Sequence, residues 1–333
     1  MRARILPLTL FGLSWALSGH AQTLKIATLA PEGSTWMTEM RAGAEQIEAR
    51  TEGRVKFRFY GGGVQGKDSQ VRRRMRIGQL QGATFTSGAL GQLAPNVELY
   101  GLPLTFRNME EVQYVRAKMD HYLRAALEEN GQVNFGLSGA GQAYLMSGTP
   151  VRNLDDLSGQ KTWVQEGDQI AFTAFKSLGI SPVPLPLTDV LTGLQTELLD
   201  SAAMSPVGAI VLQLHTKVKY ITNLPLSYVY GALVIDAKPF SGLAEGDQAI
   251  VREVMEAIYR DFDARSVRDN AEALEALVGH GLELVEPEQD QIPQWQARIA
   301  KSNRELAEQG LISKALLDEM MAHLEEFRSS HAE

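Results

Sequence analysis

Apolar and polar residues recur along the chain with two different periods. Residues 24–29 form a short apolar run that predicts a buried strand, and a helix is expected over residues 35–50 with Ser34 as its N-cap. On that helix, apolar side chains return every three or four positions, which is the spacing of one buried face. Residues 55–60 alternate at period two, so a second strand is expected to end at the three glycines 61–63.

The same order of strand and helix continues beyond these elements. Further strands are expected over residues 82–87, 133–137 and 162–165, and further helices over residues 67–77, 109–130, 169–178, 188–199, 247–278, 294–309 and 313–329. Such alternation predicts an α/β fold in which helices cover both faces of a mainly parallel sheet. Ligands of these folds lie beyond the carboxyl ends of the strands. The candidate binding segments are therefore residues 28–34, 86–89 and 138–144.

The N-terminal residues have the pattern of a secretory leader. Two arginines precede an apolar run over residues 5–17, which is too short to span a bilayer. Gly19 and Ala21 occupy the small-residue positions that signal peptidase reads. Residues 1–21 are therefore predicted to be a signal peptide that is cleaved after Ala21, which places the mature protein in the periplasm. No cysteine follows the run, and this excludes a lipoprotein anchor.

Composition and charge exclude several classes of function. The chain has 333 residues, enough for two domains, and its formal net charge of −8 becomes −10 once the two leader arginines are removed. Its basic cluster at residues 72–76 is too small for the basic face that nucleic-acid binding requires. The mature chain has no cysteine and no histidine pair at metal-binding spacing, so no metal or cofactor site is expected. It also has no nucleophile elbow, phosphate loop or dinucleotide motif, and no residue is nominated as catalytic.

Six segments, taken in order, resemble a known family. They are residues 24–36, 52–62, 76–83 (RIGQLQGA), 153–161 (NLDDLSGQK), 182–186 (PVPLP) and 193–201 (GLQTELLDS). In order and spacing they are similar to the extracytoplasmic solute-binding proteins of TRAP transporters, the DctP type, and the similarity covers nearly the whole mature chain. The resemblance implies a two-lobed periplasmic binding protein fold that closes on a small organic solute. It also implies a partner, a separate TRAP membrane permease that receives the solute.

The chain departs from the family pattern at three positions. Ser205 stands before Pro206 where members often have an asparagine, and the other two positions lack an arginine. Members commonly carry one arginine on a second-lobe strand and another after the strand that ends the first lobe, and these hold the carboxylate of the solute. Trp163 and Gly141 stand at the corresponding positions. Because a buried unpaired anion is costly, a dicarboxylate or sialic acid becomes a poor candidate, and an apolar or aromatic solute is favoured. Lys161 or Arg152 would have to replace the arginines if the solute were anionic.

The predicted solute contacts combine aromatic and apolar side chains with neutral hydrogen-bonding groups from both lobes. They are Trp36, Thr86, Ser87, Gln142, Tyr144, Trp163, Gln165, Met204, Ser205, Val207 and Tyr230. We expect the solute to lie between the first three of these residues on one lobe and Trp163, Gln165 and Met204 on the other. For large aromatics such as Trp36 and Tyr230 the alternative is ordinary core packing.

The family architecture also predicts how the chain is divided. Lobe I is expected to contain residues 22–139 and 228–268, and lobe II residues 140–227 and 269–333, with a long helix from about residue 247 bridging them. Three functions stay open at this point. The first is transport binding, and the second is a periplasmic carrier or sensor of an apolar or lipid-like ligand whose partner is not a permease. The third is an enzyme, which the residue inventory supports least.

Overall fold

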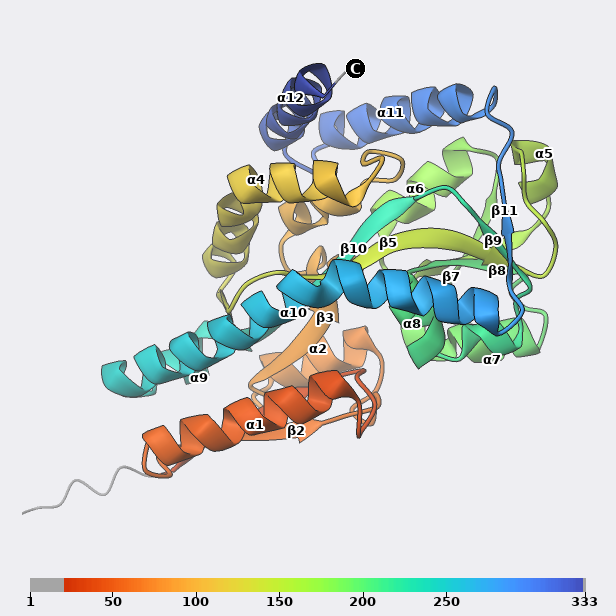
Figure 1. Ribbon diagram of the computed structural model, residues 1–333. Coiled ribbons are helices and arrows are strands. Elements are labelled where there is room, and N and C mark those ends of the chain that lie inside the picture. The colour runs from red at the N-terminus through yellow and green to blue at the C-terminus, as the bar shows by residue number, and fades with distance from the viewer. Residues whose placement is uncertain (1–20, 332–333) are drawn as a thin grey trace, which may run out of the picture.

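The computed structural model describes residues 21–331, in which a single mixed sheet runs through both halves of the molecule (Figure 1). Its main path has the strand order β2-β1-β3-β10-β5-β8-β6-β7, and β4, β9 and β11 pair off this path. The predicted α/β class is therefore confirmed. Of the predicted leader, only Ala21 lies within the described residues. No helix in the described part of the chain is both long and apolar enough to cross a membrane.

Parallel pairing occupies the two ends of the sheet, and antiparallel pairing occupies its middle. The strands are β1 (Gln22–Ala27), β2 (Val55–Tyr60), β3 (Gly82–Thr86), β4 (Gln132–Asn134), β5 (Ser138–Ser147), β6 (Lys161–Gln165), β7 (Ser181–Leu185), β8 (Ser201–Met204), β9 (Tyr220–Thr222), β10 (Ser227–Asp236) and β11 (Glu283–Val285). Strand β1 pairs in parallel with β2 and β3, and β6 pairs in parallel with β7 and β8. Strands β5 and β10 are antiparallel to their neighbours and join the two ends. We call the part built around β1–β3 lobe I and the part built around β6–β8 lobe II.

Helices cover the sheet of lobe I on both faces. They are α1 (Thr35–Arg50), α2 (Asp68–Arg76), α3 (Ser87–Leu90), the 3-10 helix η1 (Pro95–Gly101) and α4 (Met109–Glu129). Helix α1 begins where predicted, because the hydroxyl of Ser34 accepts a hydrogen bond from the Met37 amide at 3.2 Å. Its buried face contains Met37, Met40, Ala44 and Ile47, and the helical periodicity of the sequence is thereby confirmed.

Lobe II has shorter helices between its strands. They are α5 (Leu154–Leu157), α6 (Gln169–Ser177), η2 (Leu187–Asp189), α7 (Val190–Gln195), α8 (Pro206–Val211) and η3 (Leu214–Thr216). The helix expected over residues 188–199 is wrong in its length, since α7 ends at Gln195 and Glu197 adopts a left-handed φ of +58°. The segment 138–144 is likewise not a loop after a strand. It forms the first half of β5, paired to β10.

One helix spans the molecule. After α9 (Ala237–Ser241), helix α10 (Glu245–Gly279) continues for 35 residues, which corresponds to about 52 Å. It packs on α1 in lobe I, crosses β5, and packs on α8 in lobe II (Figure 1). The predicted bridging helix is therefore confirmed, and it starts two residues earlier than expected.

The last two helices, α11 (Ile292–Glu308) and α12 (Lys314–Ser330), return toward lobe I. Helix α11 packs on α6 and α12 packs on α4, as the upper part of Figure 1 shows. Helix α12 also packs on η1. Leu317, Met320 and Leu324 of α12 are buried in the same apolar cluster as the inner face of α4. An ion pair of 2.7 Å between Arg328 Nε and the buried Glu111 carboxylate closes this contact. The expectation that residues 269–333 belong wholly to lobe II does not describe the packing of α12.

Candidate functional site

A cavity of about 120 Å³ lies between the lobes, where the carboxyl ends of three strands meet. Thr86 is the last residue of β3, Gln165 of β6 and Met204 of β8, and all three line the cavity. The α/β topology predicts a ligand site at this edge of the sheet. The opposite wall is formed by η1 and by the start of β10.

Five of the eleven predicted site residues line this cavity. They are Thr86, Ser87, Trp163, Gln165 and Met204. Lobe I contributes the first two and lobe II the other three, as the sequence predicts for a site between two lobes. Direct contact between these side chains and a solute stays a prediction.

Trp36 and Tyr230 belong to the core instead. Trp36, in the first turn of α1, stacks on Phe262 of α10 with ring centroids 6.0 Å apart, and this contact fills the seam between the two helices. Tyr230 of β10 is fully buried and stacks on Tyr228, with centroids 5.5 Å apart. Neither residue lines the cavity, because both rings pack within lobe I, and contact of either with a solute stays a prediction.

The other four residues lie beside the cavity rather than on its wall. Gln142 and Tyr144 lie on β5, where Gln142 is buried and Tyr144 packs against the core of lobe II opposite Met204. The Ser205 hydroxyl caps α8 by accepting the Gly208 amide at 3.3 Å. Val207 follows on the same helix. These residues serve strand pairing and helix capping, and they are not part of the cavity lining.

The side chain of Trp163 forms part of the lobe II wall. Its indole N–H donates to the Leu185 carbonyl at 2.9 Å, so the polar edge of the ring is already satisfied within the protein. Only 8% of the residue is exposed, and it packs in the apolar cluster of lobe II. Trp163 can therefore offer a solute an aromatic surface but no free hydrogen-bond donor.

The position of the second missing arginine is occupied by another side chain. Gly141 has φ of +92°, and a Cβ added there would lie 2.4 Å from the Asn270 side chain of α10. Asn270 is held in place because its Oδ1 accepts the Val207 amide at 3.3 Å and its Nδ2 donates to the Ser266 carbonyl at 2.9 Å. An arginine at position 141 would require Asn270 to move. The two substitute cations considered from the sequence, Lys161 and Arg152, do not line the cavity.

Hydrogen bonds join the lobes across the mouth of the cavity. Thr86 Oγ1 donates to Gln165 Oε1 at 2.8 Å, and Gln165 Nε2 donates to Asp68 Oδ2 at 2.8 Å. Burial raises the pKa of Asp68, and the hydrogen bond from Gln165 partly offsets this effect. Beside them, Lys67 Nζ lies 2.8 Å from Glu166 Oε1. The structure is thus a closed arrangement in which the polar groups of Gln165 are occupied by lobe I.

Two carboxyl groups that the sequence reasoning missed also line the cavity. Glu98 comes from η1 in lobe I, and Asp168 is the N-cap of α6 in lobe II. Burial raises the pKa of Glu98 to about 9, with a further contribution from the charge of Asp168. Burial also raises the pKa of Asp168 to about 6, although the amides of Ala171 and Ile170 oppose the shift. Asp168 could have been found, since it follows the carboxyl end of β6, whereas no local pattern distinguishes Glu98.

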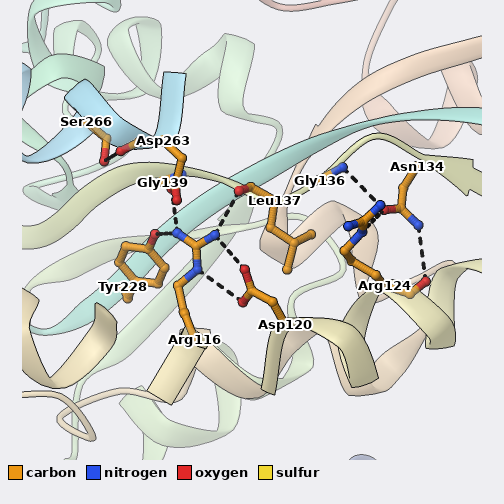
Figure 2. Close-up of polar contacts among 10 residues, drawn as sticks. All are labelled: Arg116, Asp120, Arg124, Asn134, Gly136, Leu137, Gly139, Tyr228, Asp263 and Ser266. Atoms are coloured by element: carbon orange, nitrogen blue, oxygen red, sulfur yellow. Dashed lines mark hydrogen bonds and ion pairs between the residues drawn. The ribbon is translucent and has the colours of Figure 1, made fainter. Parts of the chain in front are cut away.

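A buried arginine network supports the wall formed by β10. Figure 2 shows the guanidinium of Arg116, on α4, donating to the Tyr228 hydroxyl at 2.8 Å and to the Leu137 carbonyl at 2.8 Å. The same group pairs with Asp120 on its own helix and with Asp263 of α10. Tyr228 lines the cavity, so the network fixes one wall of the site and ties α4, α10 and β10 together. It lies next to the register shift of the β5/β10 pair at Val229/Tyr230, where the chain crosses between lobes.

The described residues hold no grouping of three or more histidine, aspartate or glutamate side chains that could bind a metal ion. The lining combines apolar side chains with a few polar groups, which is the composition of a small-molecule binding site. This geometry can enclose a small molecule between two lobes that close around it.

Comparison with known proteins also indicates that the protein binds a small molecule. Residues 26–309 match the family model DctP, described as bacterial extracellular solute-binding protein, family 7. A solute-binding protein of Roseobacter denitrificans is 25% identical over 245 residues, which cover 72% of this chain and 74% of the relative. Among solved structures, a TRAP periplasmic solute-binding protein of Xanthobacter autotrophicus with bound β-D-galacturonate aligns with a TM-score of 0.81 and 20% identity, covering 90% of this chain and 98% of that one. A Bordetella pertussis extracytoplasmic solute receptor binding pyroglutamic acid aligns with a TM-score of 0.82 and 17% identity, over 92% of this chain and 100% of that one. The chain therefore belongs to the DctP family of bacterial extracellular solute-binding proteins, and its activity is the binding of a solute rather than catalysis.

Proposed function

We propose that this protein captures a small organic solute in the cavity between its lobes and delivers it to the membrane subunits of a TRAP-type permease. The observation that carries the proposal is the meeting of β3, β6 and β8 at one cavity that both lobes line. Family membership supports it independently, and so does the fold shared with periplasmic binding proteins.

Solute capture works through closure. A solute that touches both lobes stabilises the closed state by its differential contacts, and it has no such effect on the open state. The hydrogen bonds of Gln165 with Thr86 and Asp68 are available only when the lobes are together, so they add to the same equilibrium. The permease then recognises the closed, loaded form.

The solute is less polar than a dicarboxylate and has an apolar or aromatic portion. Trp163 replaces one expected arginine, and Asn270 fills the space next to the other. No lysine, arginine or histidine is among the described residues that line the cavity. The neighbours with galacturonate and pyroglutamic acid bind molecules that carry a carboxylate, and here such a group would meet Glu98 and Asp168 instead of a cation.

The mature protein functions in the periplasm after removal of residues 1–21 by signal peptidase. The leader pattern of the sequence and the extracellular family support this location. Lobe I comprises residues 22–139 and 228–268, with the addition of α12, and lobe II comprises the remainder. The packing of α12 on α4 supports this addition.

The test is recovery of the natural solute. Mature protein is purified from its host and analysed by native mass spectrometry, and the released compound is titrated back by calorimetry. We expect Trp163→Ala to weaken its binding at least tenfold, because the ring supplies apolar wall on the lobe II side. Trp295→Ala is the control, since Trp295 is also a buried tryptophan, 2% exposed, but lies outside the cavity lining. Unchanged affinity in Trp163→Ala, or tight binding of a dicarboxylate, would contradict the proposal.

A further inference from the structure

We propose that the solute carries a positively charged nitrogen, an ammonium or amidinium group, which binds between Glu98 of lobe I and Asp168 of lobe II. This inference rests on the proposed function and names the chemical class of the solute.

Glu98 is a buried carboxylate without a partner. It is 9% exposed, it lines the cavity, and within residues 21–331 no hydrogen bond or ion pair reaches its carboxylate. The backbone beside it makes room for the charged group, because a Cβ at Gly91 would lie only 1.7 Å from Glu98 Oε1. Burial of an unpaired carboxylate is costly, so a cation bound at the same place would stabilise the ionised form of Glu98.

Asp168 approaches the cavity from the other lobe. Its Oδ1 accepts the Ala171 amide at 2.8 Å, which fixes the side chain at the start of α6. Its Oδ2 lies close to Gly88, where an added Cβ would be 2.9 Å away. Glycines at 88 and 91 thus let two carboxyl groups flank α3, one from each lobe. A cation that binds both carboxylates would stabilise the closed state directly.

The protein itself does not supply that cation. Besides the two carboxyl groups, Tyr228 is the titratable residue of the lining, and its hydroxyl already accepts from Arg116. Lys67, near the rim, is paired with Glu166. Behind the wall, the buried Tyr230 has its pKa raised by burial and by the charge of Glu98.

The protonation of the pair gives the binding a definite pH dependence. Burial raises the pKa of Glu98 to about 9 and that of Asp168 to about 6, and because the two carboxyls titrate together the pair holds about one proton at pH 7 in the closed protein. An organic cation favours the ionised form of Glu98 and displaces this proton. Its affinity therefore increases with pH up to about 9. A neutral solute that accepts a hydrogen bond from protonated Glu98 shows the opposite trend.

The apolar lining fits the rest of such a molecule. Trp163 and Phe175 come from lobe II, and Leu226 and Pro103 lie on the same wall as Tyr228. Aromatic surface next to a bound cation adds attraction to the charge pairing. An organic cation with an apolar or aromatic body therefore matches the whole cavity.

The experiment compares probes of one phenyl skeleton and three charges, with succinate added as an aliphatic dicarboxylate. Benzylamine and benzamidine serve as cations, benzyl alcohol and benzamide as neutral counterparts, and benzoate and succinate as anions. Thermal shift of the mature protein identifies binders, and calorimetry at pH 6.5 and 8.5 in buffers of different ionisation enthalpy measures affinity and proton release. We expect the cations alone to stabilise the protein, with affinity at least about tenfold higher at pH 8.5 and with proton release on binding.

Two isosteric variants test the residues themselves. Glu98→Gln should lower cation affinity at least about tenfold at pH 8.5 and abolish its pH dependence, and Asp168→Asn should weaken binding while keeping the helix cap. Glu166→Gln is the control, since this carboxylate is 42% exposed and outside the lining, and it should change affinity less than about threefold.

The outcomes separate this inference from the proposed function. Stabilisation by neutral probes or benzoate, a recovered natural solute without a basic nitrogen, or cation binding that survives Glu98→Gln overturns the inference and leaves solute capture intact. Tight binding of succinate would overturn the inference and would also contradict the proposed apolar character of the solute. If the cationic probes do not bind while probes of another charge do, the inference is likewise overturned. If no probe of any class binds and no compound is recovered from the purified protein, both proposals fail together.

Discussion

Replacement of Arg116 by methionine tests the role of the buried network in Figure 2. The guanidinium is 10% exposed and donates to five acceptor atoms, two on Asp120 and one each on Asp263, Leu137 and Tyr228. Methionine keeps most of the side-chain volume and removes all of these bonds. The substitution therefore removes the polar contacts and keeps most of the packing.

The size of the stability loss follows from the polar groups that the substitution leaves without a donor. The carboxylates of Asp120 and Asp263 are 29% and 34% exposed, so water can hydrate them after the substitution. The Leu137 carbonyl and Tyr228 hydroxyl are in buried residues, and each unsatisfied group costs about 1–3 kcal/mol. Together with the lost ion pairs, the free energy of unfolding should fall by about 3–5 kcal/mol. For a chain of this size, that fall corresponds to a decrease in Tm of about 5–8 °C.

Differential scanning calorimetry of the mature protein measures this decrease. Arg268→Met on α10 is the matched control, since Arg268 is 67% exposed and pairs with Asp269 and Glu272 on its own helix. It should lower Tm by less than about 1 °C, because exposed ion pairs contribute little. A fall of less than about 2 °C in Arg116→Met would refute the reasoning that the network is a main support of the β10 wall.

Three further predictions follow from the same structure. In ligand-free protein, Glu98→Gln should raise the free energy of unfolding by about 3 kcal/mol at pH 7. The reason is that a carboxyl pKa raised from 4.5 to about 9 makes the wild type lose stability as pH rises through that range. Urea unfolding at several pH values checks this, and wild-type and variant stabilities that change with pH in parallel would contradict it. Gly141→Ala should cost at least about 2 kcal/mol in the same assay, since alanine is strained at φ of +92° and its Cβ would collide with Asn270. Lys67→Met removes the partly exposed ion pair with Glu166 across the lobes. Solute affinity measured by calorimetry should fall less than about threefold, and at about 1 M salt the variant and the wild type should bind the solute equally well.

The sequence predicted the part of the site that depends on strand ends. Thr86 and Gln165 lie at the ends of two predicted strands, and the rule that ligands lie beyond carboxyl ends places them at the cavity without knowledge of any contact. Met204 was predicted as an apolar contact, and the strand that it ends, β8, was not predicted. The alternation of strands and helices was likewise sufficient for the α/β class, and the helical pattern indicated a long helix near α10, whereas its bridging position came from the family resemblance.

The residues that were misplaced depend on packing partners far away in the chain. Trp36 faces Phe262, more than two hundred positions later, and no local pattern identifies that contact. Gly141 stands at the position of an expected arginine, and the side chain that fills the space beside it, Asn270, lies on another element. Glu98 is buried in a short 3-10 helix whose composition resembles ordinary core. Motif comparison favours positions within the matched segments, and Glu98 lies outside all six of them.

The position of α12 has a consequence for how the chain folds. The apolar cluster of lobe I that contains Ala27 near one end of the chain also contains Leu324 near the other. Lobe I therefore cannot complete this core until the residues of α12 have been synthesised and have packed on α4. Truncation before residue 314 would leave the inner face of α4 uncovered, so the C-terminal helix is a late and necessary step in the assembly of the lobe.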